Sequence, residues 1–123
     1  MSKEFILLAM IFCHIVDDFY LQKWLASAKQ KSWWSENAPD VFYQYDYIWA
    51  LLTHAFSWSF MIMLPIAFNM SFAIDCKFVI MLLINLVTHA FVDDLKANKK
   101  AINLCLDQTI HLCQIVLTAC MFV

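Results

Sequence analysis

The stretch Asn85–Lys96, which reads NLVTHAFVDDLK, sets a histidine and an aspartate four residues apart in a segment with the apolar character of a membrane helix. Residues i and i+4 of an α-helix lie on the same face, so His89 and Asp93 are expected to point toward one centre. Both side chains can bind a metal ion when they converge. This stretch therefore predicts a helix that contributes two ligands to a buried site.

The same pairing is repeated elsewhere in the chain. His14 and Asp18 have the same spacing, and Asp107 and His111 have it in reverse order. The fourth histidine, His54, lies alone in the remaining apolar segment. Each of four apolar segments thus carries one histidine, and three of the four histidines have an aspartate one helical turn away. This recurrence indicates a metal site built inside a membrane helix bundle.

The composition of the 123-residue chain is that of one integral membrane domain spanning residues 1–123. The chain is 63% hydrophobic and 15% charged, whereas soluble domains are about half apolar and a quarter charged. A core this small cannot bury so much apolar surface, so the lipid bilayer is expected to cover much of it. The net charge of -2 and the lack of a basic patch interleaved with aromatic residues argue against nucleic-acid binding.

The hydropathy pattern predicts an all-α fold, a four-helix transmembrane bundle in up-down-up-down order. The expected helices cover about residues 4–28, 47–68, 73–96 and 101–123, near the 20 or so residues that cross a bilayer. Short connections make neighbouring helices antiparallel. Residues 29–46 are rich in Lys, Trp and Tyr, and we expect them to form an interfacial aromatic loop.

Seven groups are the predicted metal ligands: His14, Asp18, His54, His89, Asp93, Asp107 and His111. At 1.5 Å per residue they fall in one layer, about 5 to 20 Å from one membrane face. A carboxylate in the middle of a membrane helix costs about 2.5–3.5 kcal/mol, and few cations are present in these helices to pair with it. A divalent ion would offset this cost. Carboxylates with imidazoles favour zinc, with manganese or iron as alternatives.

Seven ligands exceed the needs of one tetrahedral ion, so we expect one or two ions, and two ions suit the number of ligands better. Asp17 and Asp94 each lie next to a motif aspartate, about 100° around the helix. They are the candidate catalytic residues, as a general base or as a carboxylate that holds a ligand in place. Gln22, Gln108 and Asn85 are expected to hold the ligands from outside.

Several alternatives stay open. Hydrogen bonds between His and Asp could tie the helices together without metal, the ion could be purely structural, or the polar groups could line a path for metal ions or protons. The five cysteines form no C-x-x-C pair and are expected to be small buried apolar residues. Cys13 and Cys105 are alternative metal ligands.

The lysine distribution predicts the orientation, because cytoplasmic loops carry an excess of positive charge. Six lysines lie near the predicted site and two lie at the other end: Lys23, Lys29, Lys31, Lys96, Lys99 and Lys100 against Lys3 and Lys77. We therefore expect a multi-pass protein of the inner (cytoplasmic) membrane with both termini outside the cytoplasm. The expected partners are the bilayer, metal ions, and a host membrane protein or a second copy of the chain.

Four ordered motifs also carry a family resemblance. They are His14-x3-Asp18-Phe19-x-Leu21-Gln22, then His54, then His89-x3-Asp93-x-Leu95-Lys96, then Asp107-Gln108-x2-His111. This pattern resembles an uncharacterised family of small integral membrane proteins from bacteria and their phages, catalogued as a domain of unknown function. More distantly, it is similar to membrane-bound metal-dependent hydrolases. The resemblance implies a multi-pass membrane protein and makes a metal plausible, but it implies no substrate.

These observations together predict a metal-dependent membrane hydrolase that acts on phosphoester or lipid-headgroup substrates near the cytoplasmic face. The competing class is a non-enzymatic, phage-type membrane interaction protein with a structural metal site. Asp17 and Asp94 depart from the family pattern as extra carboxylates beside the motif aspartates.

Overall fold

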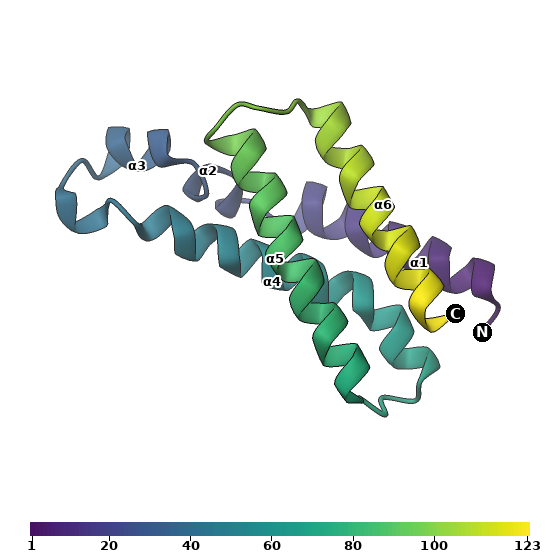
Figure 1. The fold of residues 1–123 in the computed structure, drawn as a ribbon. Coiled ribbons are helices and arrows are strands. Elements are labelled where there is room, and N and C mark those ends of the chain that lie inside the picture. The colour runs from purple at the N-terminus through teal and green to yellow at the C-terminus, as the bar shows by residue number, and fades with distance from the viewer.

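The computed structural model describes all residues 1–123, and every regular element is helical (Figure 1). The elements are α1 (Lys3–Ile15), a π-helical turn (Val16–Leu21), α2 (Leu25–Ala28), α3 (Lys31–Asn37), a 3-10 turn (Val41–Tyr43), α4 (Asp46–Asn69), α5 (Cys76–Ala97) and α6 (Leu104–Phe122). The prediction of an all-α fold is confirmed.

Three segments are long and apolar enough to cross a membrane, namely Val41–Asn69, Cys76–Ala97 and Leu104–Phe122. The first predicted helix, residues 4–28, differs from the structure. It widens into the π-helical turn after Ile15 and is interrupted before α2, where Lys23 has a left-handed φ of 44° that an α-helix cannot accommodate. The predicted aromatic loop 29–46 is also wrong in detail, because it contains α3 and the 3-10 turn.

Side-chain caps mark the beginnings of α1, α5 and α6, whereas α2, α3 and α4 begin without one. The side chain of Ser2 accepts from the backbone N–H of Phe5 at the start of α1. Asp75 caps α5 and Asn103 caps α6 in the same way, each accepting from an N–H three residues later. These short polar side chains satisfy N–H groups that have no partner within the helix.

The long helices pack around one another (Figure 1). Helix α4 packs against α1 and α5, and α6 packs against α5 and α1. Both chain termini lie at one end, where Lys77 donates to the backbone carbonyl of Met121. At the other end Asn98 contacts the α2–α3 connection, and α3 with the start of α4 extends beyond the other helices (Figure 1). The bundle therefore has two distinct ends: one carries both chain termini, and the other, the lysine-rich end, carries most of the lysines.

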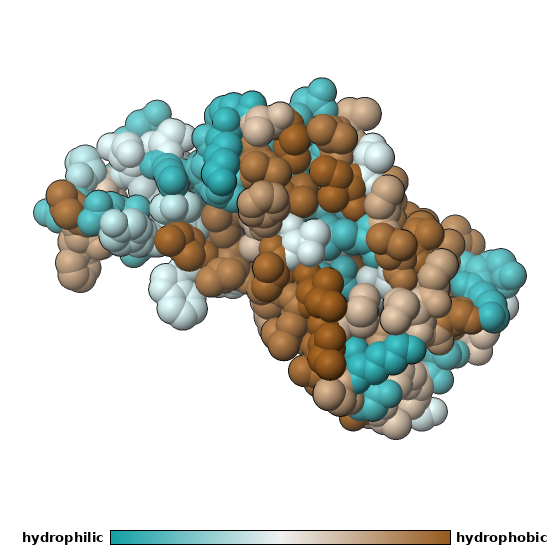
Figure 2. Space-filling model, viewed as in Figure 1, coloured by the Kyte–Doolittle hydropathy of each residue, from teal (hydrophilic) through white to brown (hydrophobic).

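Polar groups occupy much of the interior, while large apolar side chains cover the outside. An apolar core around Trp58, Ile62 and Ile115 is joined in the interior by buried histidines and aspartates. Figure 2 shows apolar side chains gathered over α5 and α6, with polar ones between and beyond them. Val87 of α5 is 65% exposed and Leu117 of α6 is 67% exposed. An apolar surface of this extent suits a lipid environment better than water.

Candidate metal centre

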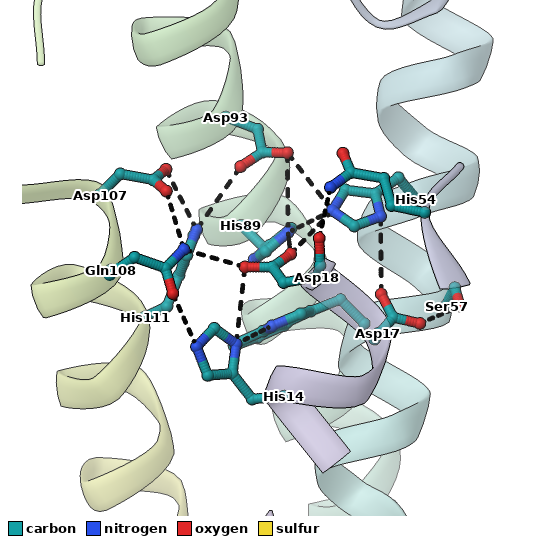
Figure 3. A network of polar contacts seen from close by, with 12 residues as sticks. His14, Asp17, Asp18, His54, Ser57, His89, Asp93, Asp107, Gln108 and His111 are labelled. Carbon is teal, nitrogen blue, oxygen red and sulfur yellow. Dashed lines mark hydrogen bonds and ion pairs between the residues drawn. The ribbon is translucent and has the colours of Figure 1, made fainter. Parts of the chain in front are cut away.

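The structure brings all seven predicted ligands together in one buried cluster (Figure 3). They come from α1, the π-helical turn, α4, α5 and α6. Six of the seven are at most 2% exposed: His14, His54, His89, Asp93, Asp107 and His111. The side chain of Asp18 is 7% exposed. Their convergence from helices far apart in sequence makes this cluster the candidate metal centre.

The π-helical turn explains how two consecutive aspartates both reach the cluster. Its wide turn is closed by the backbone N–H of Gln22 donating to the carbonyl of Asp17, five residues earlier, at 3.1 Å. Asp17 then lies on the Nδ1 side of His54 and Asp18 on the Nε2 side. π-helical turns of this kind are frequent at functional sites.

Three candidate donor atoms converge as a ligand triad. His54 Nε2 lies 3.1 Å from Asp18 Oδ1 and 3.2 Å from His89 Nε2. The third side of the triangle, from His89 Nε2 to Asp18 Oδ1, is 3.9 Å. A tetrahedral ion with bonds of about 2.0–2.1 Å has ligands about 3.3–3.4 Å apart. The triad therefore fits one face of a tetrahedral ion with little adjustment.

Asp17 supports this triad from outside. Its Oδ2 lies 3.5 Å from His54 Nδ1, and its Oδ1 accepts from the hydroxyl of Ser57 at 2.5 Å. A carboxylate beside Nδ1 favours the proton on that nitrogen and leaves the Nε2 lone pair directed into the cluster. In this position Asp17 orients the ring of His54, a candidate ligand.

A second triad shares His89 with the first. The candidate donor atoms of His89, Asp93 and His111 all lie within 4.8 Å of one another. His111 Nε2 is 3.5 Å from Asp93 Oδ1 and 3.3 Å from Asp107 Oδ1, and both His111 Nε2 and Asp107 Oδ1 are buried without a hydrogen-bond partner. Buried polar atoms without partners are costly, which favours an ion among them when the imidazole of His111 is neutral.

The tautomer of His111 follows from its neighbour Gln114. Gln114 Nε2 lies 3.4 Å from the backbone carbonyl of Asn85 and donates to it, so Gln114 Oε1 faces His111. That oxygen accepts from His111 Nδ1 at 3.1 Å. In the neutral ring, His111 Nε2 then has a free lone pair. Asn85, which we expected to hold the predicted ligands from outside, contacts Gln114 and through it positions His111.

His14 differs from the other three histidines, because both of its ring nitrogens already have protein partners. Trp58 Nε1 donates to His14 Nδ1 at 2.8 Å. The NH2 of Gln108 lies 3.1 Å from both Asp18 Oδ2 and Asp107 Oδ2, so its Oε1 accepts from His14 Nε2 at 3.0 Å. His14 thus anchors the network, and its ligand role stays a prediction.

Two lysines pair with carboxylates of the cluster. Lys29 is 5% exposed, and its Nζ lies 2.5 Å from Asp93 Oδ2. Lys96 Nζ lies 2.6 Å from Asp107 Oδ2. The pairing of Lys29 is a feature that the sequence analysis missed, since it placed Lys29 in an interfacial loop.

With all four histidines neutral, the charges of the cluster do not balance without a further cation. Four carboxylates, those of Asp17, Asp18, Asp93 and Asp107, face two ammonium groups, so with neutral histidines two negative charges remain. Two unbalanced charges in a buried site are costly. One divalent ion would balance them.

The structure does not bring Asp94 into the cluster. Asp94 Oδ1 accepts from Asn98 Nδ2 at 2.8 Å, and Asp94 Oδ2 lies 3.8 Å from Lys99 Nζ. Asn98 in turn donates to the carbonyl of Lys29 and accepts from the N–H of Lys31. Through Asn98, Asp94 therefore helps to hold the α2–α3 connection in place. A catalytic role for Asp94 stays a prediction.

Aromatic stacking fixes the ring of His89. It lies between Trp58, at a centroid distance of 4.2 Å, and His111, at 4.1 Å. Trp58 is fully buried and also donates to His14, so one indole positions two histidines. Sequence inspection gives Trp58 no special role, since an aromatic residue in an apolar segment is ordinary.

The expectation of buried cysteines is wrong. Cys76, Cys105, Cys113 and Cys120 are exposed, and Cys13 is half-buried. Polar groups occupy the interior positions of these helices, which leaves the cysteines on the outer faces. Neither Cys13 nor Cys105 belongs to a ligand triad.

A comparison with protein families matches residues 6–123 to a family described as "Protein of unknown function (DUF3307)". The match covers nearly the whole chain, including every residue of the candidate centre. No curated protein and no solved structure matches the chain.

Proposed function

The chain belongs to the DUF3307 family, whose function is unknown, and from the site we propose that it is an integral membrane protein that holds a divalent metal ion inside a helix bundle. The observation that carries this proposal is the convergence of Asp18 Oδ1, His54 Nε2 and His89 Nε2 at 3.1–3.9 Å. Zinc suits this mixed imidazole and carboxylate set, with manganese or iron as alternatives.

The charge balance favours one ion over two. A single divalent ion matches the two unbalanced negative charges, whereas a second would leave excess positive charge. His89 also belongs to both triads, and a neutral imidazole has one ring-nitrogen lone pair, which serves one ion. The triad of Asp18, His54 and His89 is the better site, because Asp93 Oδ2 is already held by Lys29.

Four spans in up-down-up-down order form the proposed bundle, with α1 and the π-helical turn as the first. This proposal is supported by the meeting of the chain termini at one end and by the lysines at the other. The lysine-rich end would face the cytoplasm, with both termini outside. The centre then lies nearer the cytoplasmic face of the inner membrane.

A hydrolase is the activity that this centre supports best. Three protein ligands leave a coordination position open, as in catalytic zinc sites. An ion held there would supply Lewis-acid chemistry, by polarising a phosphoryl oxygen and lowering the pKa of bound water. The chain itself contributes Asp17, which orients His54, and Lys29 and Lys96, which place positive charge beside the centre. Phosphoester or lipid-headgroup substrates fit this arrangement.

A non-enzymatic membrane interaction protein is the second candidate. The observation that favours it is an exposed aromatic surface on the segment that extends beyond the bundle. Phe42 is 83% exposed, Trp49 is 74% exposed and Tyr45 is 65% exposed. A host membrane protein or a second copy of the chain could bind there, and the ion would then be structural.

Hydrolysis of 4-nitrophenyl phosphate and of phosphatidylglycerol by the purified, zinc-loaded protein tests the activity. His89→Gln should lose both metal and turnover, because it removes a ligand. Asp17→Asn should keep the ion and lose most of the turnover, because His54 is less well oriented. Asp94→Asn tests the other candidate catalytic carboxylate. Full turnover in both Asp variants would leave them no catalytic role, and no turnover by the wild type would favour the interaction protein.

A further inference from the structure

A hollow of about 300 Å³ opens at the lysine-rich end, beside the metal centre. Its lining residues are Gln22, Ala26, Lys29, Gln30, Lys96, Ala97 and Lys100. We infer, resting on the proposed function, that this lysine hollow binds the phosphate-type anionic group of the substrate. None of its lining residues takes part in either candidate ligand triad.

Two lysines connect the hollow to the centre. Lys29 and Lys96 line the hollow, and their ammonium groups contact Asp93 and Asp107 of the cluster at 2.5 and 2.6 Å. A single layer of side chains therefore separates an anion in the hollow from the polar groups of the cluster.

The charge of the lining selects for anions. Three of the seven lining residues are lysines and none is acidic. A cation would be repelled from this opening, so the hollow does not suit a metal or proton path. Lys100 has no hydrogen bond or ion pair through its ammonium group, which leaves that group available to a ligand.

The backbone holds Gln22 in the wall of the hollow. Gln22 lines the hollow, and its Nε2 donates to the carbonyl of Asp18 at 2.8 Å. The ligand specificity of the hollow therefore comes from its lysines, whose positive charge suits a phosphate group.

A clamp holds the wall of the hollow in place. Asn98 Nδ2 donates to the carbonyl of Lys29 at 3.0 Å, and Asn98 Oδ1 accepts from the N–H of Lys31 at 2.7 Å. Asp94 accepts from the same Asn98 amide at 2.8 Å. These bonds fix the α2–α3 connection against the end of α5, so the hollow is largely formed before a ligand arrives.

Phosphate binding by the full-length protein in detergent tests the inference. Lys100 has a left-handed φ of 55°, which Asn tolerates, so Lys100→Asn removes the free charge and keeps the backbone. Lys23→Asn is the matched control, because Lys23 is exposed, has a φ of 44° and does not line the hollow. By calorimetry with inorganic phosphate, Lys100→Asn should bind about threefold to tenfold more weakly, and Lys23→Asn should bind nearly as the wild type does.

The metal is controlled by repeating each titration after chelation, with zinc content and melting temperature measured for every variant. The lysine hollow predicts the same relative loss in Lys100→Asn with and without zinc. A wild type that binds no zinc at all, with Lys100→Asn still showing this loss, would contradict the proposed function and support the anion site. Equal phosphate affinity in Lys100→Asn and the wild type, an equal loss in Lys23→Asn, or no phosphate binding by the wild type would overturn the inference.

Two membrane compositions identify the source of the anionic group. The protein is placed in nanodiscs of digalactosyl diacylglycerol, which has no phosphate, with or without added phosphatidylglycerol. Competition between phosphatidylglycerol and inorganic phosphate would support the hollow with a lipid headgroup as its ligand. Phosphate affinity that is unchanged by phosphatidylglycerol, yet still reduced by Lys100→Asn, would support it with a soluble phosphoester.

Discussion

Replacing Lys29 by Met should destabilise the protein strongly. Lys29 is 5% exposed, and its ammonium group lies 2.5 Å from Asp93 Oδ2. Met keeps the unbranched apolar stem and removes only the charge, so the buried carboxylate of Asp93 loses its cation. Breaking a buried ion pair from one side costs about 3–5 kcal/mol. Chelated protein is used, so that a metal ion cannot replace the lost charge.

The double variant Lys29→Met/Asp93→Asn is the control for this prediction. It removes both charges, and replacing a whole buried ion pair is often close to neutral. Unfolding of each protein in mixed micelles, titrated with SDS and followed by tryptophan fluorescence, gives the free energies. We expect the double variant to recover most of the loss. Unfolding of Lys29→Met at the wild-type SDS fraction would refute the reasoning, because Asp93 would then not depend on Lys29.

Three further predictions concern topology, ligand choice and the clamp. A cysteine at Ser35 in a Cys-free background should resist an impermeant thiol reagent in intact cells; labelling there would reverse the orientation. His14→Gln should retain the ion on elemental analysis, because both ring nitrogens of His14 have protein partners. Loss of the ion in this variant would show that His14 is a ligand. Asn98→Ala should accelerate amide exchange at Lys31 about fivefold, since that N–H loses its acceptor; unchanged exchange would exclude the clamp.

Spacing was sufficient to predict the meeting of the histidines and aspartates. His89 with Asp93, and Asp107 with His111, lie one helical turn apart on regular helices, where sequence separation fixes the shared face. The all-α fold followed from the long apolar segments of the chain. The resemblance to a family of unknown function is confirmed by the match over residues 6–123. The assignment of individual ligands remains a prediction.

Residue spacing could not predict where the backbone departs from a regular helix or which distant residues form ion pairs. The widening of the helix at Val16–Leu21 has no hydropathy signal, and it changes where Asp17 points. The burial of Lys29 depends on a contact with Asp93, 64 residues away, which spacing within one helix cannot reveal. Asp94 shows the converse, because it follows the candidate ligand Asp93 in sequence and yet lies against the α2–α3 connection.

The most direct test of the central claim is the metal content of protein purified without chelators, joined to X-ray absorption at the edge of the metal found. The proposed centre predicts about one divalent ion per chain, bound only by nitrogen and oxygen at about 2.0–2.2 Å, with imidazole scattering that decreases in His89→Gln. Protein that carries no ion, or an ion bound by sulfur, would contradict a centre built from Asp18, His54 and His89.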